Sequence, residues 1–92
     1  MRLHVPLKLQ GSDTQGQKFE ELVTTEDVSL SGFLFACATR LPADSVVRVS
    51  LMSNGKTDYV GKAKIVHSST KETLVRQYGC RFTEKVGPWV LQ

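Results

Sequence analysis

The chain has 92 residues, of which 40% are hydrophobic and 23% charged, a balance typical of a soluble globular domain and not of a disordered tail. It has neither an apolar run of the roughly 20 residues that a membrane helix needs nor a secretory signal, so we expect one cytoplasmic domain, residues 1–92, without membrane insertion. The net charge of +3 suits a small anionic ligand, but the lysines and arginines are scattered along the sequence, which argues against DNA or RNA as a partner.

The first predicted element is a half-buried strand near the N-terminus. Pro6 within it cannot donate a hydrogen bond to a neighbouring strand, which predicts an edge strand or a bulge there. The next segment, 11–16, has the Gly, Ser and Asp content of a turn, and residues 19–28 form a second extended run. Four apolar side chains alternate with polar ones along the first strand and share one face: Leu3, Val5, Leu7 and Leu9.

The second run ends at a bend, residues 27–32, where an acid, a hydroxyl and a glycine stand together in the order Asp-x-Ser-x-x-Gly. Asp27 can cap backbone N–H groups in an Asx-turn, and Gly32 allows a positive φ or the close approach of another atom. Taken alone, the pattern is that of an ordinary strand-to-strand turn. The apolar residues 33–38 follow, and they predict a strand that is buried on both faces in a closed sheet.

The second half of the chain predicts three more strands. A break at 41–44 precedes them, and a polar segment, 68–72, predicts a loop before the last one. Asn54-Gly55 predicts a type I′ hairpin turn, because both central residues of that turn need a positive φ. Gly61 predicts a bulge or a tight bend. The strands are predicted at residues 46–52, 58–67 and 73–82.

Six short strands at near-regular spacing, with no convincing helical period, predict an all-β barrel whose closure removes exposed sheet edges. In the last strand Tyr78, Cys80 and Phe82 share one face, while Gly79 and Arg81 share the other. Trp89 is expected to cover one open end of the barrel, with an interaction surface as the alternative.

Catalysis and metal binding have little support in the sequence. His4 and His67 lie on different predicted strands, and neither has a Cys, Asp or Glu at the spacing of metal ligands. The neighbouring carboxylates at 20–21 and 26–27 are expected to point to opposite faces of a strand, so they would not form an acid–base pair unless a bulge re-aimed one of them. Cys37 and Cys80 each lie in an apolar stretch and are interpreted as buried thiols without a disulfide. We therefore expect no enzyme, no metal and no cofactor.

Three features, in this order, resemble the PilZ domain family over nearly the whole chain. They are an N-terminal strand that starts from Arg2 and runs into Val-Pro-Leu-Lys-Leu, the bend at 27–32, and the closing Tyr-Gly-Cys-Arg-Phe at 78–82. The resemblance implies a six-stranded antiparallel Greek-key β-barrel that binds the bacterial second messenger cyclic di-GMP. The family binds it through an Arg-x-x-x-Arg segment and the Asp-x-Ser-x-x-Gly bend. The bend is complete here, and Arg2 resembles the second arginine of the other signature, whose first arginine would fall before residue 1.

The resemblance also implies a role for each candidate site residue. Asp27 would accept hydrogen bonds from the N1–H and N2–H₂ edge of a guanine, and Arg2 would offer a guanidinium fork to phosphate oxygens or to the O6/N7 edge. Ser29 would contact a base or a phosphate, and Gly32 would let the backbone approach the ligand. His67 would stack on a base, the alternative being an ordinary histidine at the end of a strand.

As a receptor, the domain would work as a switch. The ligand would bridge the N-terminal arm that carries Arg2 to the bend at Asp27, and so change the surface offered to a protein partner or a neighbouring domain. The alternative is a PilZ-like barrel that serves as a protein–protein interaction module without nucleotide. A missing guanidinium would weaken binding by roughly ten- to a hundredfold.

Overall fold

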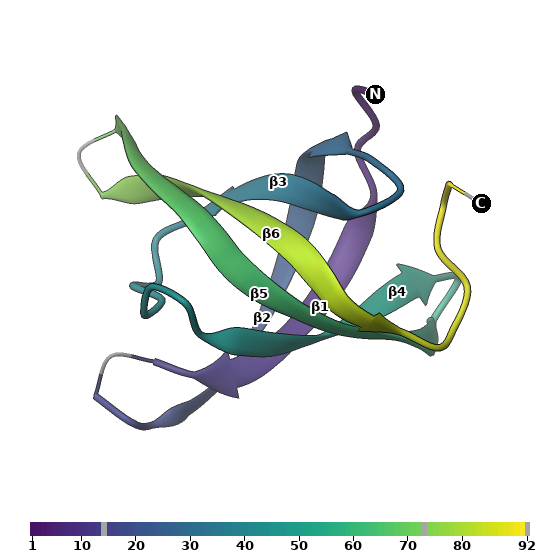
Figure 1. The fold of residues 1–92 in the computed structure, drawn as a ribbon, viewed down its shortest axis with the longest axis horizontal. Coiled ribbons are helices and arrows are strands. Elements are labelled where there is room, and N and C mark those ends of the chain that lie inside the picture. The colour runs from purple at the N-terminus through teal and green to yellow at the C-terminus, as the bar shows by residue number, and fades with distance from the viewer. Residues whose placement is uncertain (14, 73, 92) are drawn as a thin grey trace.

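The computed structural model describes residues 1–13, 15–72 and 74–91, which form an antiparallel β-barrel (Figure 1). Its strands are β1 (Pro6–Ser12), β2 (Lys18–Val28), β3 (Gly32–Cys37), β4 (Val46–Ser53), β5 (Lys56–Glu72) and β6 (Val75–Lys85). They hydrogen-bond in the closed order β1-β2-β3-β6-β5-β4. The first three strands follow one another, and β4 then returns to pair with β1, which is a Greek-key connection. The predicted six-stranded all-β barrel is confirmed.

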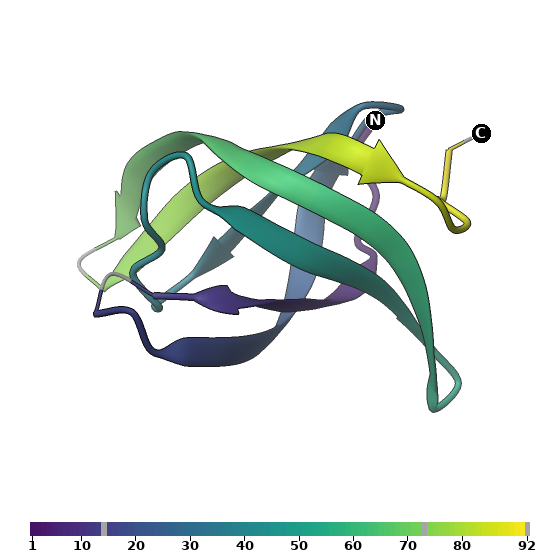
Figure 2. The same cartoon turned by 60° about the horizontal axis from the view of Figure 1, so that its bottom comes forward.

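The strands curve around a common interior (Figure 2), which is filled by side chains that alternate along them. In β1, Leu7 and Leu9 are buried and Lys8 between them is partly exposed. Leu3 and Val5, predicted as part of the same strand, precede β1 and pack against the core. The other core residues include Val23, Val28, Phe33, Phe35, Leu41, Val47, Val49, Val60, Ala63, Ile65, Tyr78 and Cys80.

Pro6 does not mark an edge strand, so that prediction is wrong. The strand β1 pairs with β2 on one side and with β4 on the other. Pro6 is tolerated because it is the first residue of β1, where its ring opposes only Thr24 of β2. Just before it, the Thr25 hydroxyl accepts a hydrogen bond from the Val5 N–H at 2.8 Å and donates to the Leu3 carbonyl at 2.6 Å. A side chain therefore continues the β1–β2 ladder past the proline.

The polar segment 68–72 is a strand, not the predicted loop. It is the last part of β5, and in it Ser68 lies opposite Tyr78 and Thr70 opposite Arg76 of β6. The pairing of β5 with β4 ends at Lys64, so the end of β5 has a neighbour on one side only and extends beyond the barrel wall (Figure 1). The side chains of Ser68, Thr70 and Lys71 are accordingly exposed to solvent. Residue 73, predicted to begin the last strand, lies outside the described residues.

The two glycine-based predictions in the β4–β5 region are confirmed. Asn54 and Gly55 both have a positive φ, of 47° and 77°, as a type I′ turn requires. The register of β4 against β5 shifts next to Gly61, which is a bulge. Gly61 also lies so close to β6 that an added Cβ would stand 1.9 Å from the Glu84 carbonyl oxygen.

Trp89 covers one end of the barrel, as predicted, and is only 3% exposed. Its ring stands edge-on to Phe82, with 4.8 Å between the ring centroids, and 5.7 Å from Phe33. The thiol of Cys80 is buried, and this burial raises its pKa to about 12. Cys37 is partly exposed, and burial raises its pKa as well. Both free thiols therefore stay protonated at neutral pH and serve packing.

Candidate functional site

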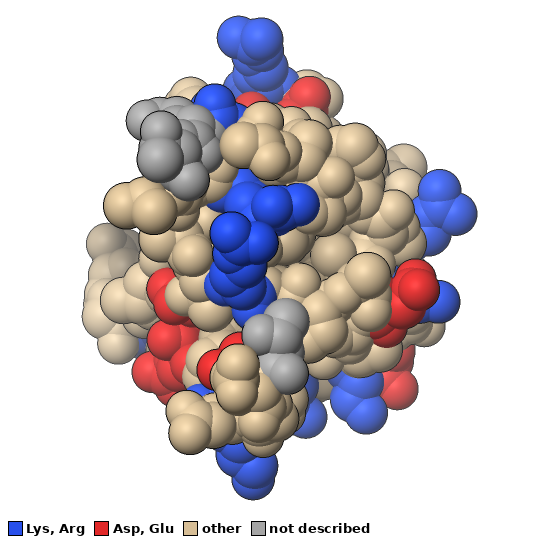
Figure 3. Space-filling view, turned by 90° about the vertical axis from the view of Figure 1, so that its left-hand side faces the viewer, with Lys and Arg blue, Asp and Glu red and all other residues tan. Residues whose placement is uncertain are grey.

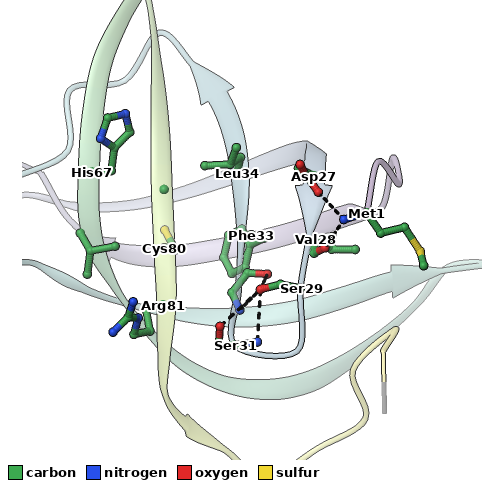
Figure 4. Close-up of a pocket in the computed structure, with 13 residues that line it drawn as sticks. Met1, Asp27, Val28, Ser29, Ser31, Phe33, Leu34, His67, Cys80 and Arg81 are labelled. Atoms are coloured by element: carbon green, nitrogen blue, oxygen red, sulfur yellow. Dashed lines mark hydrogen bonds and ion pairs between the residues drawn. The ribbon is translucent and has the colours of Figure 1, made fainter.

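The bend between β2 and β3 is closed by the hydroxyl of Ser29. Its Oγ accepts hydrogen bonds from the N–H groups of Ser31 at 3.3 Å and Gly32 at 3.1 Å, and the Ser29 N–H donates to the Gly32 carbonyl at 2.9 Å (Figure 4). The capping expected of Asp27 is thus done by Ser29. The hydroxyl of Ser29 holds the shape of the bend, and its side chain remains exposed.

Gly32 is needed because β6 crosses directly against it. A Cβ at Gly32 would stand 1.9 Å from the Cys80 carbonyl oxygen. Gly32 does not have a positive φ, unlike Gly16 and Gly55. Of the two reasons predicted for this glycine, close approach is correct, and the approaching atom belongs to the neighbouring strand.

The backbone of the bend is also held by hydrogen bonds from β6 and from the segment that follows it. The carbonyl groups of residues 29, 30 and 31 accept hydrogen bonds, in that order, from Trp89 Nε1 at 2.8 Å, Lys85 Nζ at 2.6 Å and the Phe82 N–H at 2.7 Å. With three consecutive carbonyls held from β6 and the segment after it, the bend is a fixed part of the barrel wall.

Asp27 lies at the end of β2, beside the N-terminal arm, residues 1–5. Its Oδ1 accepts a hydrogen bond from the Met1 ammonium at 2.8 Å, and the Val28 N–H donates to the Met1 carbonyl at 2.8 Å. The ammonium lowers the pKa of Asp27, chiefly through this hydrogen bond and further through its charge, and the charge of Arg2 acts in the same direction. The carboxylate is therefore ionised at neutral pH. It is 43% exposed and offers only acceptor sites.

A depression of about 430 Å³, here called the bend pocket, opens between the bend and strands β3, β5 and β6. Its lining includes Asp27, Ser29, Gly32, Leu34 and His67 (Figure 4). Gly79 forms part of its floor, because a Cβ there would stand 3.1 Å from both the Leu34 and the His67 side chains. The pocket lies in the volume range of small-molecule sites.

The structure gathers four of the five predicted site residues, Asp27, Ser29, Gly32 and His67, around the bend pocket. Arg2 lines a second depression of about 370 Å³, here called the arm pocket. Asp27 and Leu34 belong to both pockets and separate them. Arg2 therefore lies in a pocket that adjoins the bend pocket at Asp27.

The arm pocket is bordered by an ion pair that ties β5 to β2. The Lys71 ammonium contacts Glu26, whose Oε1 accepts a hydrogen bond from Gln77 Nε2 at 2.7 Å. These hydrogen bonds, that of Gln77 first and that of Lys71 next, lower the pKa of Glu26. Figure 3 shows a short row of lysine and arginine side chains near the middle of one face, with other lysines and arginines standing apart around it.

Sequence reasoning missed Arg81 as a residue of the bend pocket. It lies on β6, directly opposite Gly32 of β3, and its side chain is exposed. The alternation in the last strand placed Arg81 on the outer face, but only the β3–β6 register brings it to the bend. In the described ranges no three His, Cys, Asp or Glu side chains gather as a metal site.

Comparisons with known proteins agree with this architecture. A family model described as PilZ domain matches residues 1–87, a range that includes all of β1 to β6. Searches of curated proteins and of solved structures gave no match. In the part of the chain that the structure describes, no helix has the length and hydropathy of a membrane span.

Proposed function

The chain belongs to the PilZ domain family, a family of cyclic di-GMP receptor domains, and from this premise we propose that it binds cyclic di-GMP in the bend pocket. The observation that carries the proposal is the position of Asp27. This ionised and partly exposed carboxylate stands on the rim of a pocket built from the complete Asp-x-Ser-x-x-Gly bend.

The chemistry of guanine matches an acceptor-only group at this position. Its Watson–Crick edge carries two donors, N1–H and N2–H₂, which an ionised carboxylate can accept together. A guanine edge can share the Asp27 carboxylate with the Met1 ammonium or replace it, because a carboxylate has about four lone-pair sites. Leu34 and His67 offer an apolar side chain and a ring at the same pocket for contact with the base plane.

A cyclic dinucleotide has two bases and two phosphates, and one base does not use the whole site. We propose that the ligand extends past Asp27 and Leu34 into the arm pocket, where Arg2 offers its guanidinium. A guanidinium fork pairs with phosphate oxygens in a bidentate manner. Asp27, which lines both pockets, would then hold the Watson–Crick edge of one guanine.

The switch follows from the way the N-terminal arm is attached. Met1 is joined to Val28 and to Asp27, and His4 Nδ1 lies 3.0 Å from the Thr25 carbonyl oxygen. A ligand that engages both Arg2 and Asp27 competes with the Met1 ammonium for the Asp27 carboxylate and adds its own contact to the arm. Binding would therefore reposition the arm and alter the surface available to a protein partner.

Calorimetry with cyclic di-GMP, and with cyclic di-AMP as the matched control, tests which nucleotide the domain binds. We expect cyclic di-GMP to bind at least about tenfold more tightly, because adenine has no N1–H and presents a lone pair to the Asp27 carboxylate. Equal affinity for the two ligands would contradict the role of Asp27. Absence of any binding would reject the receptor function and favour the protein-interaction module.

Replacing Arg2 with alanine tests whether the N-terminal arm takes part in ligand binding. The expected result is an affinity for cyclic di-GMP about tenfold weaker, because one charge-assisted contact is lost while Asp27 and the bend stay intact. Hydrogen exchange should also show that the ligand protects residues 1–5 in the unsubstituted chain and not in the variant. Unchanged affinity and unchanged protection would mean that the arm takes no part in binding.

A further inference from the structure

One cationic side chain of the bend pocket belongs to the closing Tyr-Gly-Cys-Arg-Phe but lies outside the two signatures through which the family binds its ligand. Arg81 projects from β6 beside the bend, and within the described residues its guanidinium forms no ion pair or hydrogen bond. In Figure 4, Arg81 and His67 lie on one side of the pocket, and Asp27 and Met1 lie on the other.

The position of Arg81 is fixed by its neighbours along β6. Cys80 is buried and Phe82 packs against the core, so strand alternation turns Arg81 outward. The pairing of Arg81 with Gly32, where the two backbones come closest, sets its Cα at the foot of the bend. The site of the guanidinium is therefore determined by the barrel and not by a free loop.

The charges that line the bend pocket leave Arg81 without a counterion. They are the Met1 ammonium, the Asp27 carboxylate and the Arg81 guanidinium, and the first two form an ion pair at 2.8 Å. Lys85, also near the bend, directs its ammonium to the Leu30 carbonyl at 2.6 Å. A pocket with an unpaired guanidinium attracts an anion, and the planar fork fits a phosphate group.

On the basis of the cyclic di-GMP site described above, we propose that Arg81 is a further ligand-binding residue, which contacts a phosphate of the dinucleotide from β6. Asp27 then holds a guanine between two guanidinium groups, that of Arg2 in the arm pocket and that of Arg81 in the bend pocket. Two phosphates would thus meet two arginines, one from each pocket.

Calorimetry on four proteins tests this role: the unsubstituted chain, Arg81→Ala, Arg81→Lys and Arg40→Ala. Arg40 is an exposed arginine that lines neither pocket, so its variant controls for the loss of one positive charge. We expect Arg81→Ala to bind cyclic di-GMP about tenfold more weakly, Arg81→Lys to bind with intermediate affinity because an ammonium keeps the charge without the planar fork, and Arg40→Ala to bind like the unsubstituted chain. The salt dependence of binding should be shallower for Arg81→Ala than for the unsubstituted chain, because one ionic contact is gone.

The outcomes separate this role from the proposed function. Normal affinity in Arg81→Ala, with binding by the unsubstituted chain, would overturn the role of Arg81 and leave the cyclic di-GMP site standing. If Arg81→Lys bound cyclic di-GMP as weakly as Arg81→Ala, and the salt dependence of binding were unchanged, the phosphate contact would be overturned in favour of a contact with a base edge. No binding by the unsubstituted chain would overturn the site itself. Equal melting temperatures are expected for all four proteins, because both arginines are exposed.

Discussion

Replacing Gly32 with alanine is expected to lower the free energy of unfolding by about 3 kcal/mol or more. The added Cβ would stand 1.9 Å from the Cys80 carbonyl oxygen, and that neighbour is backbone paired in the β3–β6 ladder, which cannot rotate away as a side chain could. The two strands would have to separate where the bend ends and β3 begins. Urea denaturation followed by far-ultraviolet circular dichroism measures the change.

The matched control is Gly16→Ala, in the turn between β1 and β2. No atom lies within 4 Å of a Cβ at Gly16, so the substitution meets only the strain of a positive φ, here 78°. That strain costs about 1–2 kcal/mol. Equal losses of stability in the two variants would contradict the close approach of β6 to Gly32.

Replacing Asp27 with alanine is expected to weaken cyclic di-GMP binding by about a hundredfold or more while the barrel stays folded. Two charge-assisted hydrogen bonds to a guanine edge, each worth ~1.5–3 kcal/mol, would be lost together. Stability should change little, because the side chain is 43% exposed and its ion-pair partner is the Met1 ammonium. Calorimetry and thermal melting on the same preparations separate the two effects.

Asp58→Ala is the control for Asp27→Ala, since Asp58 is an exposed aspartate on β5 that lines neither pocket. The pH dependence gives a second readout. Because the pKa of Asp27 is lowered below 3.8, the carboxylate stays ionised and binding should hold from pH 8 down to about pH 4, then fall as the group is protonated. Retained affinity in Asp27→Ala would place the guanine contact elsewhere.

Local chemistry made much of the fold predictable. The alternation of Leu7 and Leu9 with polar residues gave the inner face of β1, and Asn54-Gly55 gave a hairpin turn whose positive φ values follow from its residue types. The bend at 27–32 was located from its own residues. Each of these features depends on contacts within a few residues along the chain.

The wrong predictions concern which strands become neighbours. Pro6 suggested an edge because its missing N–H is a local property, whereas the second partner of β1 is β4, about forty residues away in the sequence. The polar residues 68–72 suggested a loop because their pairing with β6 leaves no periodic apolar face. Arg81 was missed for the same reason, since its place opposite Gly32 depends on register.

Phe82, Lys85 and Trp89 donate the hydrogen bonds that hold the carbonyl groups of residues 29–31. These contacts have a consequence for folding during synthesis on the ribosome. The bend is made in the first third of the chain, but a nascent chain that stops before residue 82 lacks all three donors that hold its carbonyl groups. Contacts so distant in sequence form late, because a long loop must close first. The bend proposed to recognise the messenger therefore acquires its full set of hydrogen bonds only after residue 89 has been made.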